Sequence, residues 1–176
     1  MSDLTETIDR LVRPIEDWPE PGVTFRDITP LLADPAALAA VIDGLVELAE
    51  KAGPIDAVLG IEARGFLFGP SIALRLGAGF VPVRKAGKLP SASLSTSYEL
   101  EYGAAVLEMH VDALSPGARV LVVDDVLATG GTMLAAADLV QQAGATVVGN
   151  LVLIELLALG GQGRLGATGC ASLRTY

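Results

Sequence analysis

The stretch VLVVDDVLATGGTM, residues 120–133, decides the fold class of this chain. Its aliphatic run predicts a buried strand, and Asp124 and Asp125 follow at the carboxyl end of that strand. A loop with Gly130 and Gly131 comes next, and then the start of a helix. A strand, a glycine-rich turn and a helix in this order favour an α/β fold, in which ligands bind at the carboxyl ends of the strands.

The loop has the chemistry of an anion site. Its glycines allow positive φ and a close approach of the backbone to a ligand. Successive N–H groups in such a turn form a concave anion site, and the helix start adds free donors. The hydroxyls of Thr129 and Thr132 can donate further hydrogen bonds, while carboxylates beside the loop suit the hydroxyls of a ribose or a magnesium ion. We therefore expect this segment to hold a sugar phosphate.

Strand-like and helix-like segments alternate along the rest of the chain, which is typical of a mainly parallel sheet flanked by helices. Asp34 and Pro35 form a strong helix start, an N-cap residue followed by proline at the first helical position. The expected helices span residues 2–12, 35–52, 66–76 and 132–143. The expected strands span residues 55–61, 80–83, 98–102, 104–111, 119–123 and 146–155, with 98–111 forming an antiparallel hairpin.

The chain shows no internal repeat and no linker, so we expect one domain over residues 1–176. It consists of an N-terminal arm (1–33), a core (34–155) and a glycine-rich tail (156–176) whose structure the sequence leaves open. Residues 85–96, KAGKLPSASLST, are rich in Gly, Pro and Ser, which predicts a flexible loop. Whether the whole loop region 85–111 is open or closed is also left open.

Composition excludes several classes of function. The formal net charge of −9 repels nucleic-acid backbones, so we expect no nucleic-acid partner. The only cysteine, Cys170, allows no internal disulfide, and we expect it to be a buried small hydrophobe. The N-terminus lacks the apolar segment of a signal peptide, and no apolar run is long enough to span a membrane. These features predict a cytoplasmic protein without membrane contact.

Two common nucleotide loops do not explain the sequence. No GxxxxGK[ST] motif is present, so the P-loop mechanism lacks its lysine. Residues 161–166 match G-x-G-x-x-G as a string, but about ten residues follow them, too few for the helix, strand and acid of a dinucleotide site. We interpret that match as chance.

A hydrophobic strand, two acids and ATGGT together resemble the ribose-diphosphate motif of the type I phosphoribosyltransferases. The resemblance implies the fold of that family, with a small N-terminal hood and a flexible catalytic hairpin loop. It also implies transfer of ribose 5-phosphate from phosphoribosyl diphosphate to a nitrogen base. The residues that it assigns to the ribose phosphate are Asp124, Asp125, Ala128, Thr129, Gly130, Gly131 and Thr132.

Four other segments resemble those members of the family that act on adenine, and the resemblance covers nearly the whole chain. PGVTFRDITPLL (21–32) is similar to their base-covering arm, and IEARGFLFGP (61–70) to their diphosphate loop. RKAGKLP (84–90) and YELEYG (98–103) are similar to their basic strand end and catalytic hairpin. The implied reaction is purine salvage, in which adenine and phosphoribosyl diphosphate give AMP and diphosphate.

The resemblance also assigns roles to single residues. The residues expected to bind diphosphate, together with Mg²⁺ carried mainly by the substrate rather than by protein ligands, are Arg64, Arg84, Lys85 and Lys88. The residues expected to act in catalysis are Arg64, Glu101 as a proton carrier to the purine and Tyr102 as a shield of the site. The residues expected to bind adenine are Thr24, Phe25 and Arg26. A homodimer is implied, in which one of the basic residues reaches the neighbouring subunit's site, while His110 lies outside every matching motif.

Two alternatives stay open at this point. The nearest enzymatic rival is a salvage enzyme of the same family that acts on xanthine. The other is a regulatory protein that keeps the fold only to sense phosphoribosyl diphosphate, although the chain lacks the basic surface or added module that such a protein needs.

Overall fold

The computed structural model describes residues 2–100 and 103–176. They form two compact units, Met1–Gly44 and Leu45–Tyr176, and each is described by itself. The helix α3 (Pro35–Glu50) runs from the first unit into the second.

The first unit is built from short elements. It contains α1 (Ser2–Leu11), the antiparallel pair β1 (Arg13–Ile15) and β2 (Phe25–Asp27), and α2 (Thr29–Ala33). Its last helix, α3, begins where the sequence predicts: Asp34 Oδ1 accepts the N–H groups of Ala36 and Ala37 at 3.0 and 2.9 Å. The small two-stranded sheet and α2 had no counterpart among the predicted elements.

The second unit is a seven-stranded sheet in the order β5-β6-β4-β3-β7-β8-β9. Five neighbouring strands, from β4 to β9, are parallel, while β5 and β6 form an antiparallel hairpin that joins the edge at β4. The strands are β3 (Ala57–Ile61), β4 (Gly79–Lys85), β5 (Ser93–Leu100), β6 (Gly103–His110), β7 (Arg119–Leu127), β8 (Thr146–Glu155) and β9 (Ala171–Thr175). The predicted mainly parallel sheet is confirmed.

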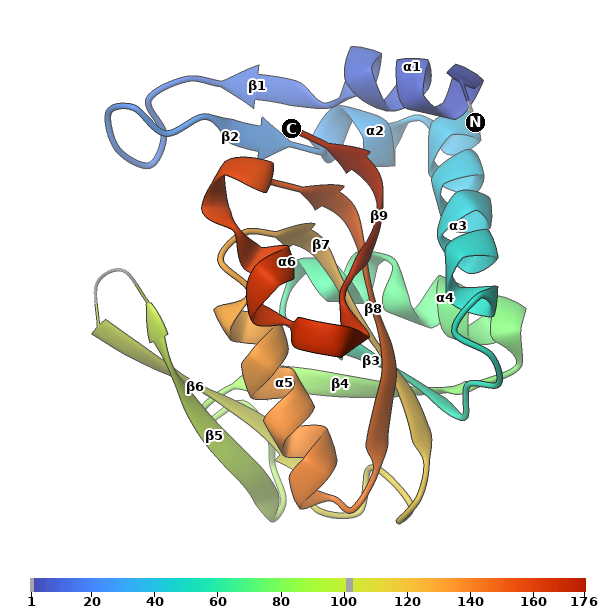
Figure 1. Cartoon of the computed structure of the whole chain (residues 1–176), viewed down its shortest axis with the longest axis vertical. Coiled ribbons are helices and arrows are strands. Elements are labelled where there is room, and N and C mark those ends of the chain that lie inside the picture. The colour runs from blue at the N-terminus through green and yellow to red at the C-terminus, as the bar shows by residue number, and fades with distance from the viewer. Residues whose placement is uncertain (1, 101–102) are drawn as a thin grey trace. The chain divides into compact units, whose positions relative to one another are not determined.

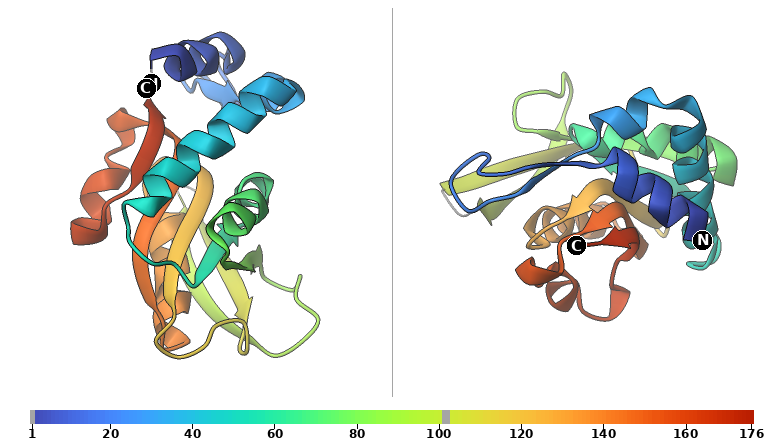
Figure 2. Two further views of the ribbon diagram at one scale, coloured as in Figure 1. Left: turned by 90° about the vertical axis from the view of Figure 1, so that its right-hand side faces the viewer. Right: turned by 90° about the horizontal axis from the view of Figure 1, so that it is seen from above.

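Helices lie on both faces of this sheet. α4 (Gly69–Leu76) covers one face, while α5 (Gly131–Gln142) and the short α6 (Gly161–Arg164) cover the other (Figures 1 and 2). Because both faces are covered, the central strands carry continuous aliphatic runs, and every residue of β3 is buried. The remaining elements are the 3₁₀ turns η1 (Arg64–Leu67), η2 (Leu157–Leu159) and η3 (Gly166–Thr168).

Three predicted boundaries were wrong, each for a physical reason. β7 continues to Leu127 because its end still pairs with β8, so the two acids lie within the strand rather than after it. The predicted helix 66–76 is split into η1 and α4, since Pro70 sets a new helix start in the first turn of α4. Residues 93–96 of the predicted flexible loop belong to β5, where they pair with β6.

The tail that the sequence left open is ordered. Its last strand, β9, extends the sheet by pairing with β8 in parallel, and three short helical turns connect the two strands. No helix within residues 2–100 and 103–176 is both long and apolar enough to cross a membrane.

Candidate active site

The predicted phosphate loop joins the end of β7 to the start of α5. Gly130 has φ +82°, the left-handed conformation that favours glycine, and its carbonyl accepts the Leu134 N–H at 3.0 Å as the first helical bond. The N–H groups of the first turn of α5 therefore have no partner within the helix and are available to an anion. A small hollow of about 60 Å³ lies here, lined by Asp124, Val126, Leu127, Ala128, Thr129, Gly130, Thr132 and Met133.

The two acids differ in their surroundings. Asp125 is 2% exposed, and its Oδ2 lies 3.0 Å from Nη1 of Arg64. That oxygen accepts no hydrogen bond from the described residues, so the contact is an ion pair rather than an aligned hydrogen bond. Asp124 is only partly buried, and its Oδ1 accepts the Asp125 N–H at 2.9 Å.

Burial and mutual repulsion govern the charges of this pair. Burial raises the pKa of Asp124 well above its usual value, and the neighbouring Asp125 charge raises it further. Burial also raises the pKa of Asp125, although the Arg64 cation opposes that rise. Two carboxylates with raised pKa values at one strand end favour a partner that brings positive charge or hydroxyl donors.

Arg64 reaches Asp125 because η1 packs directly against β7. β3 and β7 are neighbours, so the turn that follows β3 lies beside the end of β7. Gly65 permits the contact, since a Cβ at that position would lie 2.5 Å from the carbonyl oxygen of Val123. The structure thus brings together the predicted diphosphate residue and a predicted ribose residue.

The three other predicted diphosphate residues gather around a residue that the sequence reasoning missed, Glu62. Its Oε2 accepts hydrogen bonds from Nε of Arg84 at 3.2 Å and from the backbone N–H of Lys85 at 3.0 Å. Nζ of Lys88 lies 3.8 Å from its Oε1. Burial raises the pKa of Glu62, but the hydrogen bonds from Lys85 and Arg84 outweigh it and place the pKa below its usual value. The sequence signal that could have revealed Glu62 was a carboxylate two residues before Arg64.

The predicted adenine-binding residues lie in the first unit, on or beside β2. Phe25 is half-buried, and its ring meets that of Trp18 edge to face with centroids 4.5 Å apart. Thr24 is exposed. Asp27, beside Arg26, accepts Nε of Arg13 at 3.1 Å and the N–H of Thr29 at 2.9 Å. The hydrogen bonds from Thr29 and Arg13 lower the pKa of Asp27 to about 2.

The hairpin carries the two remaining predicted residues. Glu101 and Tyr102 lie outside the described residues, between β5 and β6 in the sequence. The hairpin itself is confirmed, with eight paired positions from Ser93↔His110 to Leu100↔Gly103. Gln142 at the end of α5 donates to the carbonyl of Ser95 at 3.4 Å, which ties the hairpin to the core.

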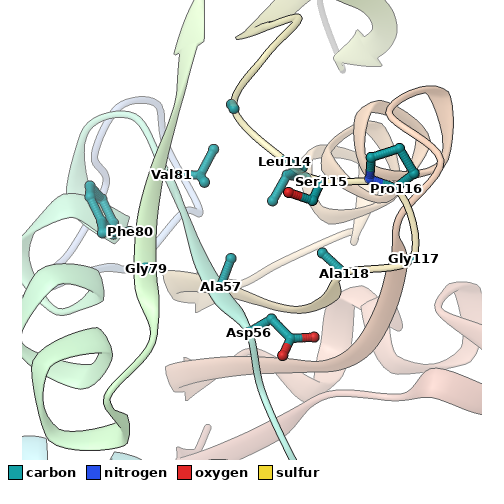
Figure 3. Close-up of a pocket in the computed structure, with 11 residues that line it drawn as sticks. Asp56, Ala57, Gly79, Phe80, Val81, Leu114, Ser115, Pro116, Gly117 and Ala118 are labelled. Atoms are coloured by element: carbon teal, nitrogen blue, oxygen red, sulfur yellow. The ribbon is translucent and has the colours of Figure 1, made fainter.

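A larger cavity of about 430 Å³ lies at the other end of the strands from the phosphate loop, at the amino ends of β3, β4 and β7 (Figure 3). Asp56, in its lining, already accepts hydrogen bonds from Nε and Nη2 of Arg119 at 2.9 and 2.7 Å. Among the described residues, no arginine or lysine lines this cavity. Size alone therefore does not identify the site, and the phosphate loop, with the ion pair of Arg64 and Asp125 beside it, is the better candidate.

Comparison with known proteins agrees with this choice. The phosphoribosyl transferase domain matches residues 27–166. The chain is 57% identical to the adenine phosphoribosyltransferase of Thermobifida fusca, covering 99% of this chain and 98% of that protein. It is 58% identical to that of Acidothermus cellulolyticus, covering 98% and 97%.

Solved structures give the same result. The adenine phosphoribosyltransferase of Thermoanaerobacter pseudethanolicus superposes with a TM-score of 0.94 at 47% identity, covering 98% of this chain and 99% of that one. That of Saccharomyces cerevisiae, solved with adenine and an imino-altritol bisphosphate, has a TM-score of 0.93 at 38% identity, covering 98% and 99%. The chain therefore belongs to the phosphoribosyl transferase domain family, on its adenine phosphoribosyltransferase branch.

Proposed function

We propose that this chain transfers the 5-phosphoribosyl group of 5-phospho-α-D-ribose 1-diphosphate to adenine, giving AMP and diphosphate in purine salvage. The observation that carries the proposal is the 57% identity to an adenine phosphoribosyltransferase over 174 residues, which include every proposed site residue. The ion pair of Arg64 with Asp125 beside the phosphate loop supports it independently.

The phosphate loop binds the 5-phosphate of the sugar. Gly130 bends the backbone, so the N–H groups of Gly131 and Thr132 face the anion together with the helix start, and the hydroxyls of Thr129 and Thr132 donate to its oxygens. Ala128 completes the loop with a side chain too small to block it. Asp124 and Asp125 accept hydrogen bonds from the ribose hydroxyls.

The basic residues stabilise the leaving group. When the ring nitrogen of adenine bonds to the anomeric carbon, the bond from that carbon to the diphosphate oxygen breaks and the diphosphate leaves with the bonding electrons. Arg64, Arg84, Lys85 and Lys88 offer fixed positive charge where this negative charge accumulates. The arginines add paired, planar donors that match phosphate oxygens. Glu62 orients the side chains of Arg84 and Lys88 through its ion pairs with them.

Magnesium fits the donors that are present. Mg²⁺ keeps several waters and is commonly bound through substrate phosphates, so the substrate diphosphate would carry the ion, with Asp124 and Asp125 nearby as added negative charge. Within residues 2–100 and 103–176 there is no group of three or more His, Cys, Asp or Glu residues suited to a metal. When bound, the ion neutralises the charge of the leaving diphosphate.

The remaining roles rest on the family resemblance. Glu101 exchanges a proton with the purine, and Tyr102 shields the reacting atoms from water, which would otherwise hydrolyse the activated sugar. Phe25 stacks on the adenine ring, and the backbone of Thr24 reads its edge. Arg26 supports the arm or pairs with an acid. We further propose that the enzyme is one functional domain that acts as a homodimer in the cytoplasm, without nucleic-acid or membrane partners.

The test is an assay of the purified protein with Mg²⁺, phosphoribosyl diphosphate and a panel of bases. The proposal predicts AMP and diphosphate in equal amounts from adenine. Consumption of xanthine or guanine in the absence of any reaction with adenine would contradict the base assignment. Tight binding of phosphoribosyl diphosphate without turnover of any base would instead favour the sensor.

A further inference from the structure

The short helix α6 forms the outer wall of the phosphate loop. A Cβ on Gly161 would overlap the carbonyl oxygen of Ala128 and would lie 2.9 Å from Cδ1 of Leu127. From the other side, a Cβ on Gly130 would lie 3.1 Å from the carbonyl oxygen of Gly161. Gly161, one glycine of the G-x-G-x-x-G string that we interpreted as chance, therefore allows the tail and the loop to pack backbone against backbone.

One side chain of α6 makes a hydrogen bond to the loop. Nη1 of Arg164 donates to the carbonyl oxygen of Thr129 at 3.2 Å. Thr129 directly precedes Gly130, so this carbonyl belongs to the same peptide unit as the Gly130 N–H. In a trans peptide the C=O and N–H point in opposite directions. A donor that holds the Thr129 carbonyl toward α6 thus holds the Gly130 N–H away from α6.

α6 is itself fixed to the sheet, so it can act as a brace. Nε2 of Gln162 donates to the carbonyl of Cys170 at 3.1 Å, just before β9. Nδ2 of Asn150, within β8, donates to the carbonyl of Gly169 at 2.7 Å. Because β9 pairs with β8, the position of Arg164 is tied to the same sheet that carries the phosphate loop.

We propose that Arg164 is a positioning residue for the phosphate loop: its hydrogen bond to the Thr129 carbonyl orients the adjoining N–H group for the 5-phosphate of the substrate. This inference rests on the proposed function for the identity of the ligand. The effect acts through a backbone contact rather than through charge at a distance, and it concerns binding of the sugar phosphate, not of the base.

The experiment compares wild type with Arg164→Ala, Arg164→Gln and Arg164→Lys. Titration calorimetry with ribose 5-phosphate measures the loop without any base. Losing a charged hydrogen-bond donor predicts a roughly tenfold weaker affinity for Arg164→Ala and a similar rise in KM for phosphoribosyl diphosphate. The KM for adenine stays within about twofold, and Arg164→Lys, which keeps a donor, recovers part of the loss.

Arg10→Ala is the matched control, because Arg10 is an exposed arginine of α1, outside both the phosphate loop and α6. It should keep the affinity for ribose 5-phosphate, with melting temperatures showing that both variants are folded. An equal loss of affinity in Arg10→Ala and Arg164→Ala would reduce the effect of Arg164 to a general loss of positive charge. Unchanged affinity in all three Arg164 variants would overturn the proposal.

Ionic strength separates positioning from attraction. At about 0.5 M salt a charge acting over a distance is largely screened, whereas a direct hydrogen bond persists. The ratio of dissociation constants between Arg164→Gln and wild type should therefore be similar at about 0.05 and about 0.5 M salt. A ratio that falls to one at high salt contradicts the inference. Because ribose 5-phosphate needs no base, a wild type that binds it but makes no AMP refutes the proposed function and leaves Arg164 testable.

Discussion

Nη1 of Arg64 lies 3.0 Å from Oδ2 of Asp125, so a cation from the turn after β3 is joined to an acid near the end of β7. Asp125 is almost fully buried, whereas the Arg64 side chain is 43% exposed. The acid is therefore fixed by packing, and it orients the more exposed arginine toward the carboxyl ends of the strands, where the phosphate loop begins. The pair couples the proposed ribose and diphosphate contacts.

Replacing Asp125 with Asn should separate binding from stability. The amide has nearly the same shape but no charge, so it should lose the ribose contact and release Arg64. We expect kcat/KM for phosphoribosyl diphosphate to fall by at least about tenfold, the size expected for the loss of a charged hydrogen-bond partner. The free energy of unfolding should change little, because the exposed arginine can be solvated. Steady-state kinetics measures kcat/KM, and denaturant unfolding measures the free energy of unfolding. The control is Asp112→Asn, at an exposed acid outside the site.

Gly130→Ala should abolish binding of ribose 5-phosphate. The position has φ +82°, and a Cβ there would lie 3.1 Å from the Gly161 carbonyl oxygen, so the loop must shift. Gly117→Ala is the matched control, since Gly117 has φ +80° but no atom within 4 Å of its added Cβ. Both variants should lose about 1–2 kcal/mol of unfolding free energy from backbone strain. Equal ribose 5-phosphate affinity in the two variants would contradict the proposed role of the loop.

Glu101→Gln should lower kcat while leaving the KM values for both substrates nearly unchanged. A glutamine keeps the size and polarity of the side chain but cannot exchange the proton, and general acid–base groups contribute roughly 10²–10⁴-fold. Steady-state kinetics with adenine measures the effect, and Glu47→Gln, at an exposed position of α3, is the control. A wild-type rate in Glu101→Gln would rule out the proton-carrier role.

Asp27→Asn should remove a part of the unfolding free energy that depends on pH. The pKa of Asp27 is lowered from 3.8 to about 2 in the folded chain, so the folded state favours the charged form. The resulting stabilisation is complete above the unfolded pKa and is lost as the pH falls from about 4 to about 2. We expect the variant to be about 1–2 kcal/mol less stable at pH 7, with the difference vanishing near pH 2. Denaturant unfolding at each pH measures the difference in unfolding free energy between wild type and variant. If that difference is the same at pH 7 and pH 2, the charge of Asp27 is not its cause.

Much of the second unit could be predicted from local sequence. β8 begins and ends at the predicted residues, and α5 differs by one residue at each end, because aliphatic runs and bounding glycines are strong local signals. The phosphate loop was predicted for the same reason: its acids, threonines and glycines all lie between Asp124 and Thr132. Membership in the family, which the comparisons show, was predicted from that segment and from the four other segments that resemble the family.

What could not be predicted depends on contacts between distant residues. Glu62 matters because of Arg84 and Lys88, and Arg164 because of Thr129, 35 positions earlier. The extension of β7 through its two acids requires pairing with β8, and β9 requires the same partner. No local propensity encodes such pairings, so the sequence left open the structure of a glycine-rich tail that proved to be an ordered part of the sheet.

The most direct test of the central claim is an assay of AMP formation by the purified wild-type protein with Mg²⁺, phosphoribosyl diphosphate and one base at a time. The account predicts that adenine alone among the purines is converted efficiently, with one diphosphate released for each AMP formed. Conversion of xanthine, hypoxanthine or guanine in preference to adenine, or binding of phosphoribosyl diphosphate without turnover of any base, would contradict it.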